Sequence, residues 1–319
     1  MEIIVFSPPQ NPKSAGSLFL YNLADEIRDL GYTAIRIIIA QDKTGLFFIS
    51  VDENNYIPLA TDTLEKLFDP QNSLIIHGEN LHHKFFDKFK VARYYLNRIG
   101  ALANIGVPRI DEYKIAWDNN FVDEPDFVLR KPLIKKPYKE SLLLDQPRSI
   151  DLTYIGKGVM YDNKFSRLPS TLELKRNWPE NNDEYLFLLS MSRFLFTYDV
   201  QTAVIQEAIY YGVMPVLLTH FPLGSMEELL ASYPSELRAC CLLINEFNEL
   251  KSGKSTNFLS NFAENRNKYI TTLDEQEKNY LDQLRKLIRS IQKHFKLTSF
   301  DAVNNTQQIT TTGSNQNLR

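Results

Sequence analysis

The sequence predicts an α/β protein that contains two Rossmann-like domains. Its 319 residues are enough for two domains, given a typical size of about 150 residues each. A strand–helix–strand pattern occurs over residues 2–40 and again over residues 192–217. Between them lies a segment rich in Lys and Pro, Arg130–Pro147, which is interpreted as a connector. Strands that alternate with helices in this way are typical of parallel sheets covered by helices.

The first half opens with an apolar strand, Glu2–Phe6, and a loop rich in Pro and Ser. An amphipathic helix is predicted over Leu18–Leu30, because its apolar residues recur at intervals of three and four. Gly31 ends this helix, and a second strand follows. The other elements expected here are a hairpin (Leu46–Val51 and Tyr56–Leu59), a helix (Thr61–Phe68), a basic helix with a solvated face (Phe85–Asn97), and strands at Thr33–Ala40, Ser73–His77, Tyr113–Trp117 and Phe127–Leu129.

The second half is predicted to hold shorter elements and a long amphipathic helix at its end. Strands are expected at Ile150–Ile155, Leu172–Lys175, Arg193–Tyr198, Met214–Leu217 and Cys240–Ile244, and helices at Asn182–Ser190, Thr202–Tyr211 and Gly224–Ala231. The long helix is placed at 273–297, and the polar residues 298–319 are expected to be disordered. The predicted domains are therefore 1–140 and 148–272.

The composition is that of an ordinary soluble protein. A net charge of −3 argues against a large nucleic-acid footprint. The two cysteines, Cys240 and Cys241, are neighbours in an apolar run, which suggests buried thiols in a reducing compartment. There is no signal segment at the amino end, and no apolar run approaches the ~18 residues of a membrane span. We therefore expect a cytoplasmic protein with at most peripheral membrane contact.

Two acidic residues in the second strand–helix–strand pattern need an explanation. Glu207 lies in the middle of the apolar stripe of the helix, and Asp199 lies where that helix begins. A carboxylate buried without a partner would cost several kcal/mol, so Glu207 should face a partner or a cleft. The alternative is a structural one, in which Asp199 caps the helix and Glu207 pairs with a nearby Lys or Arg.

A set of basic residues precedes these two acids, namely Lys157, Lys164, Arg167 and Arg176. Such cations neutralise a diphosphate, and a helix beginning at Gln201 and Thr202 would add N–H donors. A carboxylate such as Glu207 can accept hydrogen bonds from the hydroxyls of a ribose. One cleft could then hold a nucleoside diphosphate without a metal, since no Asp-x-Asp motif and no metal-type Cys/His spacing occurs. Solvated surface positions remain the alternative for each basic residue.

Three residues of the first half also lie where ligands bind in such folds. Gly16 and Ser17 precede the first helix, where backbone N–H groups could meet an anion, although an ordinary loop is equally consistent. His77 ends a strand at the edge where open α/β sheets place ligands. A structural histidine is the alternative.

The segments YIGKG, LKRNWP and SRFLFTYDVQTAVIQEAIYYGVMPVLL resemble the donor-binding half of the GT-B nucleotide-sugar glycosyltransferases, in particular the retaining family-4 type. That family has an acidic residue, seven further residues and a Glu, followed by a G-x-P-V turn. Here the acids are Asp199 and Glu207, and the turn is Gly212–Val216. The chain departs from the pattern in having Asp in place of the more usual Glu, and in a turn that is one residue longer. The resemblance covers residues 151–217 and, more weakly, residues 1–100.

The resemblance implies two Rossmann-like domains that face each other across a cleft. It implies that Glu207 holds the ribose and that Asp199 faces the donor sugar as a catalytic residue, with His77 approaching from the other domain. The remaining donor-site positions that it indicates are Gly156, Lys157, Lys164, Arg167, Arg176, Gln201 and Thr202, and Gly16 and Ser17 would lie near phosphate or acceptor.

The activity implied is transfer of a sugar from a nucleoside-diphosphate sugar to an acceptor hydroxyl. We expect retention of configuration, no metal and no cofactor other than the donor substrate. A glycan or lipid-linked acceptor is expected, in the synthesis of a cell-surface polysaccharide or glycoconjugate. Two alternatives stay open: a non-catalytic protein that binds a nucleotide sugar, and a sugar-nucleotide epimerase on the same fold.

Overall fold

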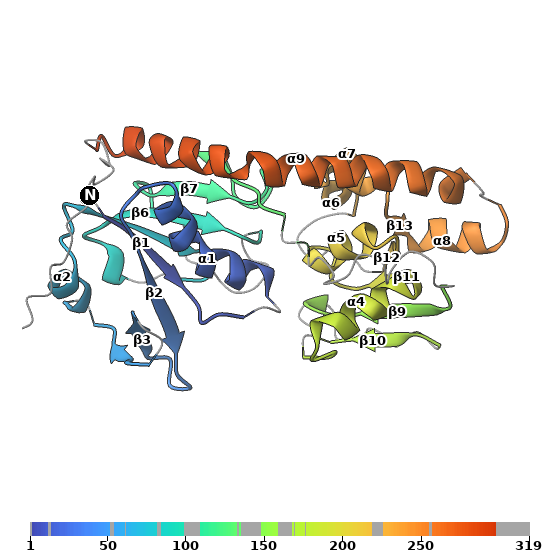
Figure 1. Ribbon diagram of the computed structural model, residues 1–319, viewed down its shortest axis with the longest axis horizontal. Helices are drawn as coiled ribbons and strands as arrows, with labels where there is room; N and C mark the ends of the chain where they lie inside the picture. The colour runs from blue at the N-terminus through green and yellow to red at the C-terminus, as the bar shows by residue number, and fades with distance from the viewer. Residues whose placement is uncertain are drawn as a thin grey trace, which may run out of the picture.

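The computed structural model describes residues 2–11, 14–51, 54–60, 62–81, 84–98, 109–132, 134, 148–158, 168, 170–175, 177–218, 226–254 and 257–297. The described strands form two sheets, one in each half of the chain (Figure 1). We call the parts built on these sheets the N-terminal and the C-terminal domain.

The N-terminal sheet has the strand order β4-β3-β2-β1-β5-β6-β7-β8. Its strands are β1 (Glu2–Ser7), β2 (Ala34–Gln41), β3 (Phe47–Ser50), β4 (Ile57–Pro58), β5 (Ser73–Gly78), β6 (Lys90–Tyr95), β7 (Tyr113–Ala116) and β8 (Phe127–Val128). The six neighbouring strands β2, β1, β5, β6, β7 and β8 pair in parallel. Strands β3 and β4 form the predicted hairpin, and both β2–β3 and β3–β4 pair antiparallel.

The C-terminal sheet has the order β10-β9-β11-β12-β13, and all of its pairs are parallel. Its strands are β9 (Ile150–Tyr154), β10 (Leu172–Leu174), β11 (Ser192–Thr197), β12 (Met214–Leu217) and β13 (Leu242–Leu243). The described helices are α1 (Ala15–Asp29), α2 (Thr63–Leu67), the 3₁₀ turn η1 (Lys84–Phe86), α4 (Asn182–Ser190), α5 (Ala203–Tyr210), α6 (Met226–Ser232), α7 (Ser235–Arg238), α8 (Ile244–Lys251) and α9 (Asn257–His294).

Helix α1 shows how the sequence sets an element. Ser14 is its N-cap, and the Ser14 side chain accepts a hydrogen bond from the Ser17 N–H at 3.4 Å. The helix therefore begins at Ala15, three residues before the predicted start. It ends just before Gly31, which adopts a φ of 89° that few other residues tolerate.

The expectation of a basic helix over Phe85–Asn97 is wrong. Residues Lys90–Tyr95 form β6, a central strand whose last five residues are buried. The charge that suggested a solvated face is buried with a partner: Arg93 is 2% exposed, and its Nη2 lies 2.9 Å from Oε2 of Glu112. A buried Arg on a parallel strand cannot be told from a surface Arg by periodicity, because both faces of the strand are covered.

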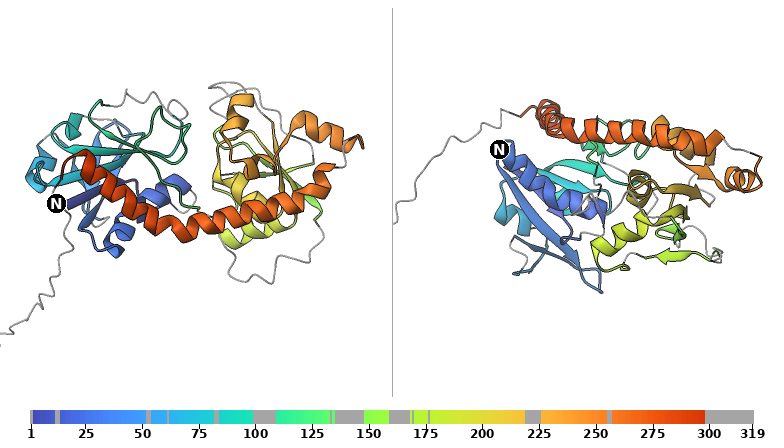
Figure 2. Two further views of the ribbon diagram at one scale, coloured as in Figure 1. Left: turned by 90° about the horizontal axis from the view of Figure 1, so that it is seen from above. Right: turned by 45° about the vertical axis from the view of Figure 1, so that its right-hand side comes forward.

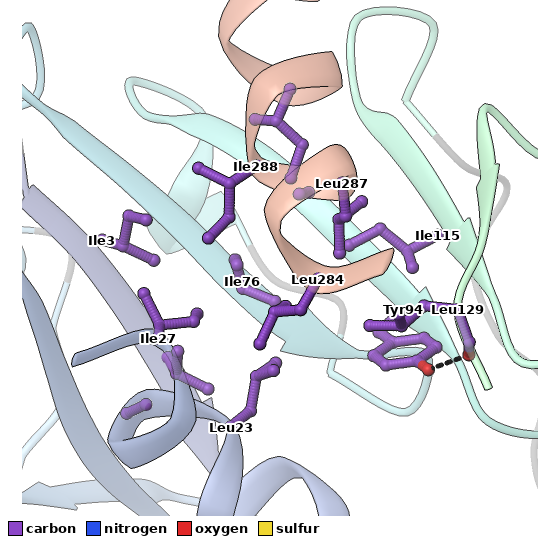
Figure 3. Close-up of a cluster of buried hydrophobic side chains, with 14 of the residues drawn as sticks. Ile3, Leu23, Ile27, Ile76, Tyr94, Ile115, Leu129, Leu284, Leu287 and Ile288 are labelled. Carbon is purple, nitrogen blue, oxygen red and sulfur yellow. Dashed lines mark hydrogen bonds between the residues drawn. The ribbon is translucent and has the colours of Figure 1, made fainter. Parts of the chain in front are cut away.

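Helix α9 is longer than predicted and belongs to both domains. It starts at Asn257, not at residue 273, and runs for 38 residues. Figures 1 and 2 show it lying along both halves of the molecule. Its first part packs in the C-terminal domain through Phe262, Tyr269 and Leu273. Its second part packs into the core that α1 and the N-terminal sheet share, as Figure 3 shows for Leu284, Leu287 and Ile288. Tyr280 and Ile291 belong to the same core.

Two further observations bear on the sequence predictions. Both cysteines are buried as free thiols, and burial raises the pKa of Cys240 to about 12. Among the helices that the structure describes, none combines the length and the apolar character that a bilayer crossing requires.

Candidate functional site

A cleft of about 900 Å³ lies between the two domains. Many of the residues that line it lie within four residues of the carboxyl end of a parallel strand, which is where α/β sheets place their ligands. These residues are Asn11 after β1, Glu79 and Asn80 after β5, Leu96 and Asn97 after β6, Trp117 and Asp118 after β7, Lys157 after β9, and Asp199 and Gln201 after β11. The carboxyl edges of the two sheets therefore face the same space.

Two helices also direct their amino ends at this cleft. Gly16 and Ser17, in the first turn of α1, line it from the N-terminal domain. Gln201 and Thr202, just before α5, line it from the C-terminal domain, and the Thr202 side chain caps α5 by accepting from the Val204 N–H at 3.4 Å. The amino end of a helix carries a partial positive charge and unbonded N–H groups. The cleft is therefore suited to an anion.

Asp199 is held rigidly at the end of β11. It is 1% exposed, and its Oδ2 accepts the backbone N–H of Lys157 at 3.0 Å. Its own N–H donates to the Thr197 hydroxyl at 3.0 Å. Gly156 makes this approach possible, because its φ is 51° and an added Cβ would lie 2.6 Å from Oδ2 of Asp199. Gly156 does not itself line the cleft, but it permits the hydrogen bond between Lys157 and Asp199.

Two buried oxygens in this region have no hydrogen-bond donor within the part of the chain that the structure describes. No hydrogen bond from the described residues reaches Oδ1 of Asp199 or Oε1 of Gln201, although both atoms are buried. Within the described part of the chain, Nζ of Lys157 lies 3.8 Å from Oδ1 of Asp199. A buried acceptor that stays unsatisfied costs about 1–3 kcal/mol. Both residues line the cleft, so a bound ligand can supply the missing hydrogen-bond donors.

The Lys157 ammonium joins the two domains. It donates to the backbone carbonyl of Gln201 at 2.7 Å and to Oδ1 of Asn97, in the other domain, at 2.9 Å. The Asn97 amide in turn donates to Oε1 of Glu79 at 2.8 Å. Glu79 is 2% exposed, and burial raises the pKa of its carboxyl above the ordinary value. Lys157 therefore puts a positive charge in the cleft and is held there from both sides.

Glu207 lies on α5 and also lines the cleft. It is 3% exposed, and its Oε2 accepts the hydroxyl of Tyr185, on α4, at 2.5 Å. Burial and the neighbouring carboxylate raise the pKa of Tyr185 well above its usual range, so this hydroxyl stays a donor. Tyr185 is thus one partner that the sequence required for Glu207, and it comes from a different helix.

His77 does not reach the cleft, which differs from the sequence prediction. Its ring stacks on Phe86 with centroids 4.9 Å apart, and its Nδ1 lies 2.8 Å from the carbonyl oxygen of Gly78. Successive side chains of a strand point to opposite faces of the sheet, and His77 faces the side covered by η1. The next residues, Glu79 and Asn80, line the cleft in its place.

The sequence analysis does not identify Glu79 or Asn97 as site residues, and it names others that remain unplaced. Glu79 follows the predicted strand end, but the histidine two residues earlier is the more conspicuous candidate in the sequence. Asn97 falls in the predicted basic helix, which does not form. Lys164, Arg167 and Arg176 lie outside the described residues.

The fold and the cleft together define the class of architecture. Two Rossmann-like domains face each other across a cleft, as the GT-B fold class predicted from the sequence requires.

No family model matches the sequence, and no curated protein matches it.

Solved structures of glycosyltransferases resemble the chain distantly. MurG of Acinetobacter baumannii matches over 90% of this chain and 99% of its own, with 11% identity and a TM-score of 0.48. The spinosyn rhamnosyltransferase SpnG matches over 92% of this chain and 96% of its own, with 8% identity and a TM-score of 0.36. SpnG has also been solved with thymidine diphosphate, and that structure matches with a TM-score of 0.34. Because these similarities are weak, the function proposed below rests on the residues of this chain.

Proposed function

We propose that this protein is a glycosyltransferase that moves a sugar from a nucleoside-diphosphate sugar to an acceptor hydroxyl. One observation carries the proposal: the cleft combines donors suited to an anion with buried acceptors suited to hydroxyls. The donors are the amino ends of α1 and α5 and the Lys157 ammonium. The acceptors that lack a partner among the described residues are Oδ1 of Asp199 and Oε1 of Gln201. A nucleotide sugar presents a diphosphate and several hydroxyls within one molecule, and so matches both sets.

The donor would lie mainly against the C-terminal domain. Glu207, held by Tyr185, would accept hydrogen bonds from the ribose hydroxyls. The N–H groups at Gln201 and Thr202, together with Lys157, would meet the diphosphate, and we keep Lys164, Arg167 and Arg176 as further candidates for this charge. Gly16 and Ser17 would approach the phosphate from the N-terminal domain. These groups supply enough positive charge that we expect transfer to persist in EDTA.

The chemistry follows from where charge develops. As the bond between the anomeric carbon and the diphosphate oxygen breaks, its electron pair moves to the diphosphate and the sugar gains oxocarbenium character. Lys157 and the helix N–H groups would stabilise the leaving diphosphate, a contribution often worth about 3 kcal/mol or more. Asp199 would orient the sugar through Oδ1. The acceptor oxygen forms the new bond and its proton passes to the departing phosphate oxygen, which gives retention when both lie on one face of the sugar.

The acceptor would lie against the N-terminal domain. The aromatic residues Trp117 and Phe121 line this side of the cleft beside Asp118 and Arg130. Arg130 is positioned by Asp118, with which it forms an ion pair, and by the carbonyl oxygen of Trp117 at 2.9 Å. Aromatic faces next to charged hydrogen-bonding groups suit a sugar ring, so we expect a glycan or a lipid-linked sugar as acceptor.

Binding and turnover of a panel of donors test the assignment. We expect one of the UDP-, GDP-, ADP- or dTDP-sugars to raise the melting temperature of the protein, because a ligand that binds only the folded state stabilises it. Transfer should then depend on an added acceptor. Conversion of the donor without acceptor would indicate an epimerase, and binding without turnover would indicate a non-catalytic module. No thermal shift with any donor would contradict the proposal.

Substitution of Glu207 tests the binding mode. Glu207→Gln should keep the fold, because Tyr185 can donate to the amide oxygen. It should weaken donor binding about tenfold or more, since a hydrogen bond to a charged group is worth about 1.5–3 kcal/mol. Isothermal titration of the donor measures this. Glu249→Gln, on the exposed face of α8, is the matched control and should bind as the unaltered protein does. Equal donor affinity in both variants would remove Glu207 from the site.

A further inference from the structure

Three polar side chains form a hydrogen-bonded chain that links the N-terminal domain to the C-terminal domain across the cleft. Glu79 follows β5 and Asn97 follows β6, while Lys157 follows β9 of the other sheet. Hydrogen bonds of 2.8 Å between Glu79 and Asn97 and of 2.9 Å between Asn97 and Lys157 connect them. All three residues line the cleft, and Glu79 and Lys157 are buried. We call this set the Glu79–Asn97–Lys157 relay.

Charge determines how the middle residue of the relay is oriented. A carboxylate only accepts hydrogen bonds, and an ammonium only donates them. The Asn97 amide must therefore give its NH₂ group to Glu79 and its oxygen to Lys157, which is the arrangement observed. The second Glu79 oxygen accepts the backbone N–H of Leu96 at 3.0 Å, so both carboxylate oxygens are held. Glu79 thus selects the one amide orientation that accepts from the ammonium.

We propose that Glu79 and Asn97 are positioning residues that hold the Lys157 ammonium of the opposite domain in the cleft. Closure of the two domains thereby fixes this positive charge in the site that binds the nucleotide sugar. The link between the domains stands on the contacts alone, and the effect on the donor rests on the proposed function. Lys157 keeps its contacts to Gln201 and Asp199 inside its own domain when the domains separate. The contact to Asn97, by contrast, joins the two domains and depends on closure.

Exchanging acid and amide groups tests the relay through activity. In Glu79→Gln the new amide must give its oxygen to the Leu96 N–H, so its NH₂ group meets the NH₂ group of Asn97. In Asn97→Asp alone, the new carboxylate at position 97 faces the carboxylate of Glu79, and the two repel each other. The double variant restores the pattern with the same net charge, because the new amide at position 79 donates to the new carboxylate at position 97, and that carboxylate accepts from Lys157. Each single variant should lower kcat/KM for the donor about tenfold or more, and the double variant should recover most of the loss.

A distance measurement tests the link independently of any activity. Spin labels at Leu67→Cys and Phe187→Cys, both exposed and in different domains, report the interdomain distance by pulsed electron paramagnetic resonance. The native thiols are buried and should stay unlabelled. The unaltered relay should give one narrow distance distribution. Asn97→Ala and Glu79→Gln should broaden or shift it, and the double variant should narrow it again.

The two readouts separate the possible failures. If no donor is turned over but the distributions respond as expected, the proposed function fails and the relay stands. If donors are turned over and neither kcat/KM nor the distributions respond to Asn97→Ala, the relay is wrong. A double variant as impaired as the single ones also contradicts it. Should Glu79→Gln fail to fold, as judged by circular dichroism, Asn97→Ala and Lys157→Met decide the question by the distance distribution.

Discussion

At the scale of single residues, the site depends on backbone shape as much as on side-chain chemistry. Gly156 permits the turn that brings the Lys157 N–H onto Asp199, because its φ of 51° lies in the left-handed region. An added Cβ would come within 2.5 Å of Cε1 of Tyr154 and 2.6 Å of Oδ2 of Asp199. Neither neighbour can retreat easily, since Tyr154 and Asp199 are both buried.

Gly156→Ala should therefore be strongly destabilising. The left-handed backbone costs about 1–2 kcal/mol for a residue with a Cβ, and overpacking adds about 1–3 kcal/mol. Gly253→Ala is the matched control, because Gly253 has a φ of 74° but no atom within 4 Å of the added Cβ. Urea unfolding should show a loss for Gly156→Ala that exceeds the loss for the control by at least about 1 kcal/mol. Equal losses would mean that the region of Asp199 adapts to the methyl group.

At the scale of elements, α5 carries opposite chemistry at its two ends. Its amino end opens on the cleft, whereas guanidinium groups cap its carboxyl end. Arg148 donates to the carbonyl oxygen of Tyr211 at 2.6 Å, and Arg266 of α9 donates to that of Ile209 at 2.9 Å. Cations at the carboxyl end satisfy the last carbonyl groups and interact favourably with the helix dipole. These two residues therefore support the helix that positions Glu207.

Arg266→Met should lower the free energy of unfolding by about 1–3 kcal/mol, because buried carbonyl groups lose charged donors. Arg193→Met is a suitable control. Arg193 is half exposed and pairs with Asp151 at the surface, where an ion pair is worth about 0–1 kcal/mol. Thermal unfolding of the two variants under one set of conditions compares them. A control that loses as much stability as Arg266→Met would show that capping of α5 contributes little.

At the scale of the whole molecule, α9 connects the two cores. In the N-terminal domain it is anchored by Tyr280, whose hydroxyl donates to Glu26 of α1. Leu284, at 1% exposed, packs against Leu23 and Ile27 in the same core (Figure 3). The helix is therefore a structural part of the N-terminal domain, although it follows the C-terminal domain in the chain.

Truncation of one apolar residue of α9 should destabilise the N-terminal domain. Leu284→Ala should cost about 2–5 kcal/mol, because the removed atoms leave a cavity in a packed core. Leu281→Ala, about one turn earlier on the exposed face and 45% exposed, should cost about 0.5 kcal/mol or less. Chemical unfolding followed by circular dichroism measures both. Similar losses of unfolding free energy in the two variants would show that Leu284 contributes little to the packing of α9 on the N-terminal domain.

The errors of the sequence analysis have physical causes that particular residues illustrate. The strand–helix–strand units are predictable because hydrophobic periodicity and glycine stops are local signals, as at α1 and Gly31. The strand Lys90–Tyr95 is not predictable in this way. Its Arg93 looks like a surface charge in the sequence, and only the structure shows that it is buried with Glu112 as its partner. His77 stands out over Glu79 because the sequence does not show which side chains of a strand end face the cleft.

The sequence by itself determined the α/β class, the two domains, and the helix that carries Glu207, since each follows from patterns within a few tens of residues. Only the tertiary structure decided which polar groups meet. Glu79, Asn97 and Lys157 are far apart in the chain and lie on two different sheets, and Tyr185 reaches Glu207 from another helix. Hydrogen bonds act over about 3 Å, so a site assembled from strand ends of two domains exists only once those domains are packed together.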